Sequence, residues 1–180
     1  MTTILLARHG ETDWNLQQRW QGHTDTPLND TGREQARALG EELAGERIDA
    51  VFSSDLIRAH ETARLVAAPR KLSVIALRDL RERHFGSVEG LTTDEVFARY
   101  PDIRDLQADD GESREEMVER VLSVIRRIAE THPEGSVLVV SHGGPMRAVL
   151  THCGIDGVDR IQNCHVVRIE VVDGRLRGVD

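Results

Sequence analysis

The chain contains four short, uninterrupted runs of apolar residues, each bounded by polar or turn-forming residues. They are Ile4–Ala7, Ala50–Phe52, Val74–Leu77 and Val137–Val140. Continuous apolar runs of this length are typical of strands buried on both faces, as in a parallel sheet. The later segment Val166–Val172 alternates apolar and polar positions instead. That alternation predicts an antiparallel strand at the edge of the sheet.

Helical patterns separate these strands. Apolar residues recur at helical spacing after the turn at 29–32, and a second helix is expected over about 55–67. A capping-box sequence at 113–116 predicts the start of a long helix that ends near His132 and Pro133. A further helix begins at Gly143-Gly144-Pro145, since proline suits the first helical turn. This alternation predicts an α/β fold, a three-layer α/β/α sandwich with a mostly parallel sheet and one antiparallel edge strand.

The segment from about residue 80 to 112 is the least regular part of the chain. It holds one short helix candidate, Thr93–Tyr100, which Pro101 would stop. We expect this segment to form a lid over one end of the sheet. Because 180 residues have room for one hydrophobic core, we expect a single domain over residues 1–180.

The net charge and the cysteines narrow the class of protein. A formal net charge of −8 argues against broad attraction to nucleic acid or to an anionic membrane. Two cysteines without a CxxC motif are no disulfide framework and suit a reducing compartment. No apolar stretch reaches the roughly 20 residues that span a bilayer. We therefore expect a cytoplasmic protein with no nucleic-acid or membrane partner.

Polar residues follow each of the four apolar strands closely. Arg8-His9-Gly10 comes directly after the first strand, and Ser53-Ser54 leads from the second strand towards Arg58. Glu82 lies five residues beyond the third strand, and Ser141–Gly144 follows the fourth. The carboxyl ends of parallel strands meet at one edge of a sheet, where open α/β folds bind their ligands. We expect these side chains to meet there.

These residues belong to a longer series of ordered sequence blocks. The blocks are Arg8–Asn15, Gln21-Gly22, Asp25–Leu28 with Gly32, Ser53–Ala59, Leu80–Glu82 with Phe85-Gly86 and Glu89-Gly90, Gly111–Ser113, and Ser141–Gly144. In this order, and over most of the chain, they resemble the histidine phosphatase superfamily, also called phosphoglycerate-mutase-like. A single Arg-His-Gly tripeptide would be weak evidence, whereas the ordered series is specific.

The resemblance implies five catalytic residues. His9 is the expected nucleophile, and it must be neutral to attack phosphorus; the neighbouring Arg8 and Arg58 disfavour its protonation. Both arginines can offer planar forks of donors to phosphoryl oxygens. The resemblance implies that His142 hydrogen-bonds the phosphoryl group in transfer. It also implies that Glu82 is the general acid, which protonates the leaving oxygen and later activates water.

Five further residues are expected to bind substrate. The Gly143 amide lies at a helix N-terminus and so suits an anion. The resemblance gives Asn15 a contact with the phosphate and places Gln21 and Gly22 along the pocket rim. His23 follows that pair directly and could reach the substrate.

No metal ion and no cofactor are expected. The chain lacks HExxH and similar ligand spacings, and the adjacent Arg8-His9 pair would repel a cation. Gly143-Gly144 matches neither the dinucleotide nor the nucleoside-triphosphate loop.

The expected function is hydrolysis of a small phosphate monoester by a monomer or homodimer. A cofactor-primed phosphoglycerate mutase is the first alternative, but mutases of this family usually have longer lids and C-terminal tails that restrain water. A phosphatase that acts on phosphohistidine in proteins and a non-catalytic binding module are the others, although the complete catalytic set argues against the last. Val88 and Asp109-Asp110 depart from the common family pattern and leave the pocket shape open.

Overall fold

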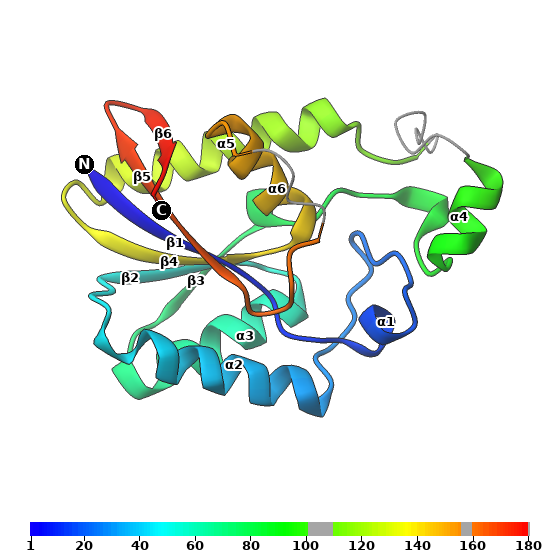
Figure 1. Cartoon of the computed structure of the whole chain (residues 1–180), viewed down its shortest axis with the longest axis horizontal. Helices are drawn as coiled ribbons and strands as arrows, with labels where there is room; N and C mark the ends of the chain where they lie inside the picture. Colours follow the sequence, from blue (N-terminus) through cyan, green and yellow to red (C-terminus); the bar gives the residue numbers. More distant parts are fainter. Residues whose placement is uncertain (101–109, 156–159, 180) are drawn as a thin grey trace.

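A six-stranded sheet forms the middle layer of the molecule (Figure 1). The computed structural model describes residues 1–100, 110–155 and 160–179. In these parts the strand order is β3-β2-β4-β1-β5-β6. The strands are β1 (Thr2–Arg8), β2 (Ala50–Ser54), β3 (Val74–Leu77), β4 (Ser136–Ser141), β5 (Val166–Val172) and β6 (Arg175–Gly178). The strands from β1 to β4 are parallel, whereas β5 pairs antiparallel with both β1 and β6.

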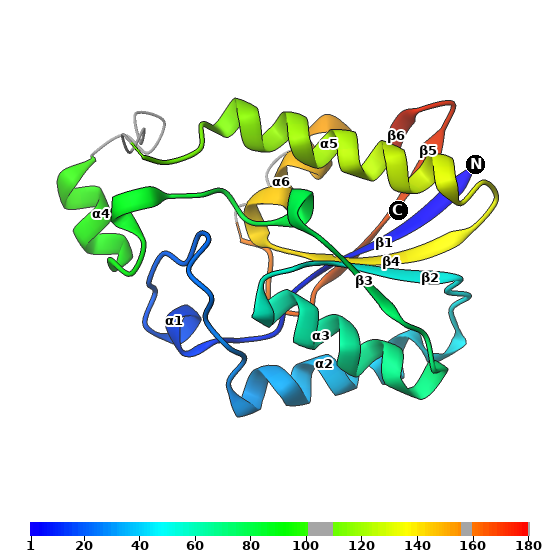
Figure 2. The same ribbon diagram turned by 180° about the vertical axis from the view of Figure 1, so that it is seen from behind.

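Two pairs of helices cover the two faces of the sheet. Helices α2 (Asp30–Glu42) and α3 (Ile57–Ala67) lie on one face, and α5 (Arg114–Thr131) and α6 (Gly143–His152) lie on the other (Figures 1 and 2). Along β1, Ile4 and Leu6 belong to the core under α5 and α6, whereas Leu5 and Ala7 belong to the core over α2 and α3. The continuous apolar run is therefore buried on both faces. The predicted three-layer α/β/α sandwich is confirmed.

Side-chain caps begin α2 and α5, and the cap of α5 is the predicted capping box. The side chain of Asn29 accepts from the amide of Gly32 at the start of α2. Ser113 and Glu116 form both bonds of the capping box that begins α5. Each cap pairs backbone N–H groups that have no partner within the helix, and this explains why the helices begin at these residues.

Two predictions about the edges of the sheet are wrong. Strand β5 is antiparallel but not at the edge, because β6 pairs with its outer side. Asp173 and Gly174 have φ values of 50° and 73°, and this is the turn chemistry of a tight hairpin that returns the chain. Strand β3 is itself an edge strand, so its apolar run is not buried on both faces: Ile75 is 47% exposed.

The less regular segments lie beyond the carboxyl ends of the parallel strands (Figure 1). They include α1 (Asp13–Leu16), α4 (Thr93–Arg99) and the 3-10 turns η3 (Arg78–Leu80) and η4 (Gly86–Val88); η1 (Leu43–Gly45) and η2 (Ala68–Arg70) follow α2 and α3. Val88 is buried with Val96 in a small cluster that also includes Trp20 and Phe85. Of the segment expected to form a lid, residues 101–109, including Pro101 and Asp109, lie outside the described residues, and a lid role stays a prediction. No described helix is long and apolar enough to cross a membrane.

Candidate active site

The ends of β1 and β4 bring two buried histidines together. Arg8 and Ser141 are register partners at the ends of these parallel strands, and the His9 amide donates to the Ser141 carbonyl at 3.0 Å. His9 and His142 follow directly, and their ring centroids lie 5.1 Å apart at an angle of 59°. The residues are 3% and 0% exposed. The parallel pairing of the two strands thus joins two predicted site residues that lie far apart in the sequence.

Hydrogen bonding and charge set the tautomer and the charge state of the His9 imidazole. Its Nδ1 lies 2.7 Å from the Gly10 carbonyl oxygen. A carbonyl can only accept, so Nδ1 carries the proton, and in the neutral ring Nε2 keeps its lone pair. Burial holds the pKa of His9 well below its ordinary value, and the positive charges of Arg58 and Arg8 lower it further. The structure therefore presents His9 as a neutral imidazole.

Backbone carbonyls hold the two arginines beside this pair. The Nη1 atom of Arg8 donates to the Ile161 carbonyl at 2.6 Å. The Nη atoms of Arg58, at the start of α3, donate to the carbonyls of Thr24 and Gly22 at 2.9 and 2.8 Å. Burial lowers the pKa of Arg8, and it lowers the pKa of Arg58 to about 10. Both guanidinium groups therefore stay charged at neutral pH.

Four buried side-chain nitrogens in the described structure have no hydrogen-bond partner, and all belong to these predicted site residues. They are Nε of Arg8, Nε of Arg58, and both Nδ1 and Nε2 of His142. Leaving a buried polar group unpaired costs about 1–3 kcal/mol, and more for a charged group, so such groups mark strained or functional sites. Burial, with Arg58 next, also holds the pKa of His142 well below its ordinary value. The set suits the oxygens of a phosphoryl group, which can accept from all three residues.

Glu82 lies across from the histidines, against the start of α6. Its Oε2 accepts from the Gly144 amide at 3.0 Å, and its Oε1 accepts from the Arg83 amide at 2.9 Å. A Cβ atom at Gly144 would lie 2.1 Å from Oε1, so any larger residue there would displace the Glu82 carboxylate. The neighbouring Arg81 points away, because its guanidinium forms two 2.7 Å bonds with the carboxylate of Asp55.

Hydrogen bonds from two side chains, Ser141 and Arg120, hold the backbone around Glu82 in place. The Ser141 hydroxyl donates to the Leu80 carbonyl at 2.7 Å. Arg120, on α5, donates to the carbonyls of Asp79, Arg81 and Glu82 at 2.9–3.0 Å and also pairs with Glu112. The Glu82 carboxylate is therefore positioned from both β4 and α5.

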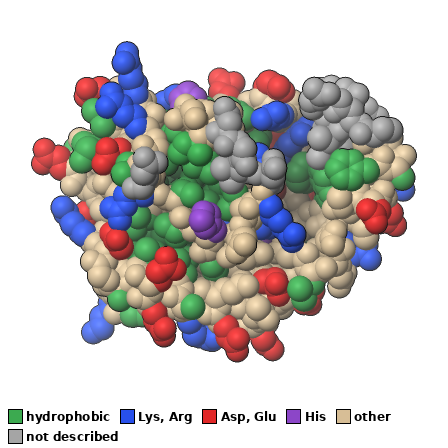
Figure 3. Space-filling view, in the orientation of Figure 1, with side chains coloured by type: hydrophobic (Ala, Val, Ile, Leu, Met, Phe, Trp, Pro, Cys, Tyr) green, Lys and Arg blue, Asp and Glu red, His purple; other side chains and the backbone are tan. Residues whose placement is uncertain are grey.

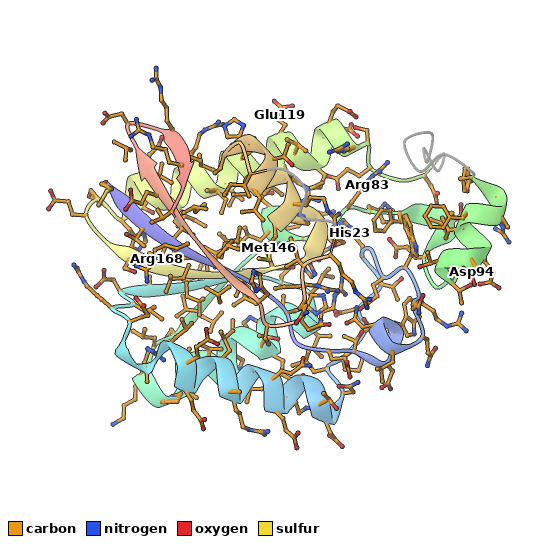
Figure 4. All side chains as sticks on the ribbon, viewed as in Figure 1. His23, Arg83, Asp94, Glu119, Met146 and Arg168 are labelled. Atoms are coloured by element: carbon orange, nitrogen blue, oxygen red, sulfur yellow. The ribbon has the colours of Figure 1, made fainter. Side chains whose placement is uncertain are left out.

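A cavity of about 990 Å³ opens next to these groups. Its wall combines charged, amide and aromatic side chains. Among the described residues it is lined by Arg8, Trp14, Asn15, Gln18, Arg19, Trp20, Glu82, Arg83, Phe85, Thr93, Ser113, Arg114, Glu115, Met117, Gly143, Gly144, Arg147, Ala148, Arg160, Ile161 and Asn163. Figure 4 shows labelled His23 and Arg83 between the sheet and α4, with Arg168 towards the other end of the molecule.

The predicted substrate-binding residues divide into two groups. Asn15 and Gly143 are part of this wall. Gln21, Gly22 and His23 are absent from the wall as the described residues define it, and instead they hold neighbouring segments. The Gln21 Oε1 accepts from the hydroxyls of Thr12 and Thr26 at 3.1 and 2.5 Å.

Gly22 and His23 brace the arginine and the acid of the site. Gly22 has a φ of 49° and presents its carbonyl to Arg58, and a Cβ atom there would lie 2.0 Å from the Glu89 carboxylate. The His23 Nε2 contacts the Glu82 carbonyl at 2.9 Å, and its ring lies 4.7 Å from that of His84. Gly22 and His23 therefore contact Arg58 and Glu82, and neither is part of the cavity wall as the described residues define it.

Sequence reasoning missed Asn163 and Thr62, which contact the predicted set, as well as Arg120. The Asn163 Nδ2 donates to the His9 carbonyl at 3.0 Å and to the Asn15 Oδ1 at 3.3 Å. The Thr62 hydroxyl accepts from the Gly10 amide at 3.0 Å and donates to the Arg58 carbonyl at 2.7 Å. Thr62 could have been found, because it lies one helical turn after Arg58. Asn163 stands in a turn before β5 with no local signal.

A neutral buried histidine, unpaired cationic donors and a carboxylic acid at the carboxyl edge of an α/β sheet are the parts needed for phosphoryl transfer. No group of three or more His, Cys, Asp or Glu side chains in the described parts of the chain lies close enough to hold a metal ion.

Comparisons with known proteins place this chain in a family. The family model of the histidine phosphatase superfamily (branch 1) matches residues 4–179. The chain is 37% identical over 183 residues to the uncharacterized phosphatase PhoE of Bacillus subtilis, covering 98% of this chain and 92% of that one. It is 40% identical over 160 residues to a metal-independent phosphoserine phosphatase of Arabidopsis thaliana, covering 83% and 67%.

A solved structure has a similar fold over nearly the whole chain. YhfR of Bacillus stearothermophilus has a TM-score of 0.89 and 30% identity, covering 99% of this chain and 95% of that one. The chain belongs to the histidine phosphatase superfamily. Within it, the chain is a phosphoric monoester hydrolase.

Proposed function

We propose that this protein hydrolyses small phosphate monoesters through a phosphohistidine on His9, with Glu82 as general acid and then general base. The observation that carries this proposal is the group of unpaired, buried nitrogens on Arg8, Arg58 and His142 around a neutral imidazole. A phosphoryl group in transfer spreads negative charge over three oxygens, and donors fixed in advance stabilise that charge.

The first step forms the phosphoenzyme. The phosphoryl oxygens accept hydrogen bonds from Arg8, Arg58 and His142. The His9 Nε2 lone pair then attacks phosphorus, and the bond from phosphorus to the ester oxygen breaks. Glu82 gives its proton to that oxygen, so the alcohol leaves neutral. The bond from His9 Nδ1 to the Gly10 carbonyl keeps the ring in the correct tautomer and stabilises the positive charge that develops on it.

The second step releases phosphate. Glu82, now a carboxylate, accepts a proton from a water molecule whose oxygen attacks phosphorus. The bond from phosphorus to Nε2 breaks, and neutral His9 is restored. Without substrate, the Glu82 carboxylate lies at the N-terminus of α6, on the Gly144 amide.

The physical surroundings favour hydrolysis over mutase chemistry. A mutase must keep water away from the phosphohistidine until the substrate takes the phosphoryl group back. Here a cavity of about 990 Å³ leads to Arg8 and Glu82, with room for water beside a small substrate. The name of the Arabidopsis relative, a metal-independent phosphoserine phosphatase, supports a metal-independent reaction as well. We place the activity in the cytoplasm, where the free thiols of Cys153 and Cys164 would stay reduced.

The test is hydrolysis of an aryl phosphate in excess EDTA by the wild-type protein and by the His9→Ala variant. We expect wild-type hydrolysis to continue and the variant to be inactive. Full activity in the variant would refute the mechanism, and loss of wild-type activity in EDTA would point to a metalloenzyme. A parallel assay with 3-phosphoglycerate, primed by the 2,3-bisphosphate, tests for a mutase: isomerisation faster than phosphate release would reverse the assignment.

A further inference from the structure

Glu89 is a shielded carboxylate that the hydrolysis steps above do not use. It belongs to one of the ordered sequence blocks and is absent from the cavity wall as the described residues define it. Asp and Glu side chains stand out from the surface across the face drawn in Figure 3, whereas the Glu89 side chain is only 11% exposed. Burying a charged group costs free energy unless hydrogen bonds compensate it. The partners of this carboxylate therefore show what it does in the fold.

Two separate segments donate hydrogen bonds to the Glu89 carboxylate. Its Oε1 accepts from the amides of His23 and Phe85 at 2.9 and 3.0 Å. Its Oε2 accepts from the amide and the hydroxyl of Thr24 at 2.8 and 2.6 Å. An ionised carboxylate can only accept, so all four contacts are compatible with it. Glu89 thus fixes the loop of residues 22–24 against the segment that carries Phe85.

The same loop holds the Arg58 guanidinium, which the hydrolysis needs. Both described hydrogen bonds of this group go to the loop: Nη1 donates to the Thr24 carbonyl at 2.9 Å, and Nη2 donates to the Gly22 carbonyl at 2.8 Å. The Nε atom of Arg58 is buried and has no partner among the described residues. Because a guanidinium is planar, two bonds on its Nη atoms fix the direction of the free Nε–H. The position of loop 22–24 therefore sets how Arg58 meets the phosphoryl oxygens.

Glu89 also supports the charge of Arg58. Burial lowers the pKa of Arg58 to about 10, whereas the negative charges of Glu82, Asp25 and Glu89 raise it. A negative charge near a buried guanidinium favours its cationic form. Hydrogen bonding and charge thus both link Glu89 to Arg58.

The loop has a weaker link to Glu82. The His23 Nε2 lies 2.9 Å from the Glu82 carbonyl oxygen, but Arg120 donates to the same carbonyl at 3.0 Å. The backbone of Glu82 therefore keeps one support when the loop is disturbed, whereas the Arg58 guanidinium loses both of its described bonds. An effect of Glu89 on the reaction should consequently appear through Arg58.

We propose that Glu89 is a positioning residue, which fixes loop 22–24 so that the loop carbonyls aim Arg58 at the phosphoryl group. The proposal rests on the phosphatase function proposed above. Glu89 contacts no substrate atom and acts only through Arg58. Since every monoester presents the same phosphoryl group to Arg58, Glu89 supports the hydrolysis of all of them equally.

Glu89→Gln tests this role. The amide keeps the shape of the side chain but replaces one acceptor oxygen by an NH₂ group, which cannot accept from an N–H. We expect kcat/KM to fall by about 10- to 100-fold, the factor that one hydrogen bond from a charged group contributes, and equally for an aryl phosphate and for sn-glycerol 3-phosphate. The inhibition constant of inorganic phosphate should rise about 10-fold, because free phosphate meets Arg58 without a leaving group for Glu82 to protonate.

A double-variant cycle shows whether the effect passes through Arg58. In an Arg58→Ala background, Glu89→Gln should lower kcat/KM for the aryl phosphate by less than about 2-fold, because the group that Glu89 positions is already gone. A merely structural role would instead lower the Tm and leave phosphate inhibition as in the wild type.

Glu95→Gln is the matched control. Glu95 also accepts from the amide and the hydroxyl of a threonine, Thr92, at 2.7 and 2.9 Å, but it does so at the start of α4 and has no described contact with Arg58. This variant should keep the wild-type kcat/KM and phosphate inhibition. Glu89→Asp keeps both acceptor oxygens and should recover part of the activity lost in Glu89→Gln. If Glu89→Gln does not fold, Glu89→Asp undergoes the same assays, with an equal loss of about 3- to 10-fold expected for both substrates.

The outcomes separate the two proposals. Wild-type kcat/KM in Glu89→Gln, a loss confined to sn-glycerol 3-phosphate, or losses that multiply in the double variant would overturn the positioning role and leave the phosphatase standing. If neither the wild type nor Glu95→Gln hydrolyses the aryl phosphate, the proposed function itself fails.

Discussion

The two buried histidines make the stability of this protein depend on pH, and His142→Gln isolates the effect. The pKa values of His9 and His142 in the folded protein lie well below 6.5, whereas the unfolded chain has ordinary histidines. Below pH ~6.5 the unfolded state therefore binds protons that the folded state cannot bind. Stability is consequently full above this pH and is lost as the pH falls.

The size of the loss follows from proton linkage. Each histidine that stays neutral in the folded protein lowers the free energy of unfolding by about 2 kcal/mol between about pH 7 and about pH 5. The pair lowers it by about 4 kcal/mol. This is a large share of the roughly 5–15 kcal/mol by which a domain is stable. His142→Gln removes one of the two groups, so its free energy of unfolding should lose about 2 kcal/mol less than that of the wild type over this range.

Urea unfolding at several pH values between these limits measures the difference directly. Asp49 and Asp55, whose pKa values are lowered by hydrogen bonds, are present in both proteins and cancel in the comparison. Parallel curves for wild type and variant would refute the reasoning, since they would mean that His142 titrates in the fold as it does in the unfolded chain. The same burial keeps His9 neutral, so protonation of His9 should not set the acidic limit of activity.

Three further predictions concern Glu82 and its supports. Glu82→Gln should lower kcat/KM by about 10²–10⁴ for alkyl phosphates and much less for aryl phosphates, whose leaving groups need no acid; equal losses would argue against a general acid. Gly144→Ala places a Cβ atom where the Glu82 carboxylate lies. We therefore expect kcat/KM for the same alkyl phosphates to fall by at least roughly 10-fold, in a protein with the wild-type Tm. Wild-type rates would show that the carboxylate can act from another position. Arg120→Met removes the ion pair with Glu112 and the hydrogen bonds to three carbonyls, and it should lower the free energy of unfolding by about 3 kcal/mol and the Tm by about 6–12 °C. An unchanged melting curve would contradict that role.

The central sheet could be predicted from sequence because its signal is local. The apolar runs that become β1, β2 and β4 have neighbouring strands on both sides, and every residue in them except Ala50 is buried, so the apolar pattern is unbroken. The same pattern was misleading for β3, since whether a strand is covered depends on its position in the sheet. Strand β6 was missed although Asp173-Gly174 is a hairpin signal, because Arg175–Gly178 holds only one buried apolar residue.

Only the site residues that directly follow the parallel strands could be placed together from the sequence. Arg8-His9 and His142 follow adjacent parallel strands, so the topology predicts that they meet. Asn163 contacts the His9 carbonyl from a turn before β5, and Arg120 contacts the Glu82 carbonyl from α5. Such contacts depend on how loops and helices pack in three dimensions, and neither spacing nor periodicity reports that. Gln21 and Gly22 show the reverse: the sequence marked them as important, and the structure shows them holding the loop that contacts Arg58.

The most direct test of the account is to trap the phosphoenzyme and find which residue carries it. Wild-type protein and Glu82→Gln are mixed with an aryl phosphate, quenched in alkali, and digested for mass spectrometry. We predict an acid-labile, alkali-stable phosphoryl group on the peptide that contains His9, and none in His9→Ala. A phosphoryl group on any other residue, or turnover by His9→Ala, would contradict the central claim.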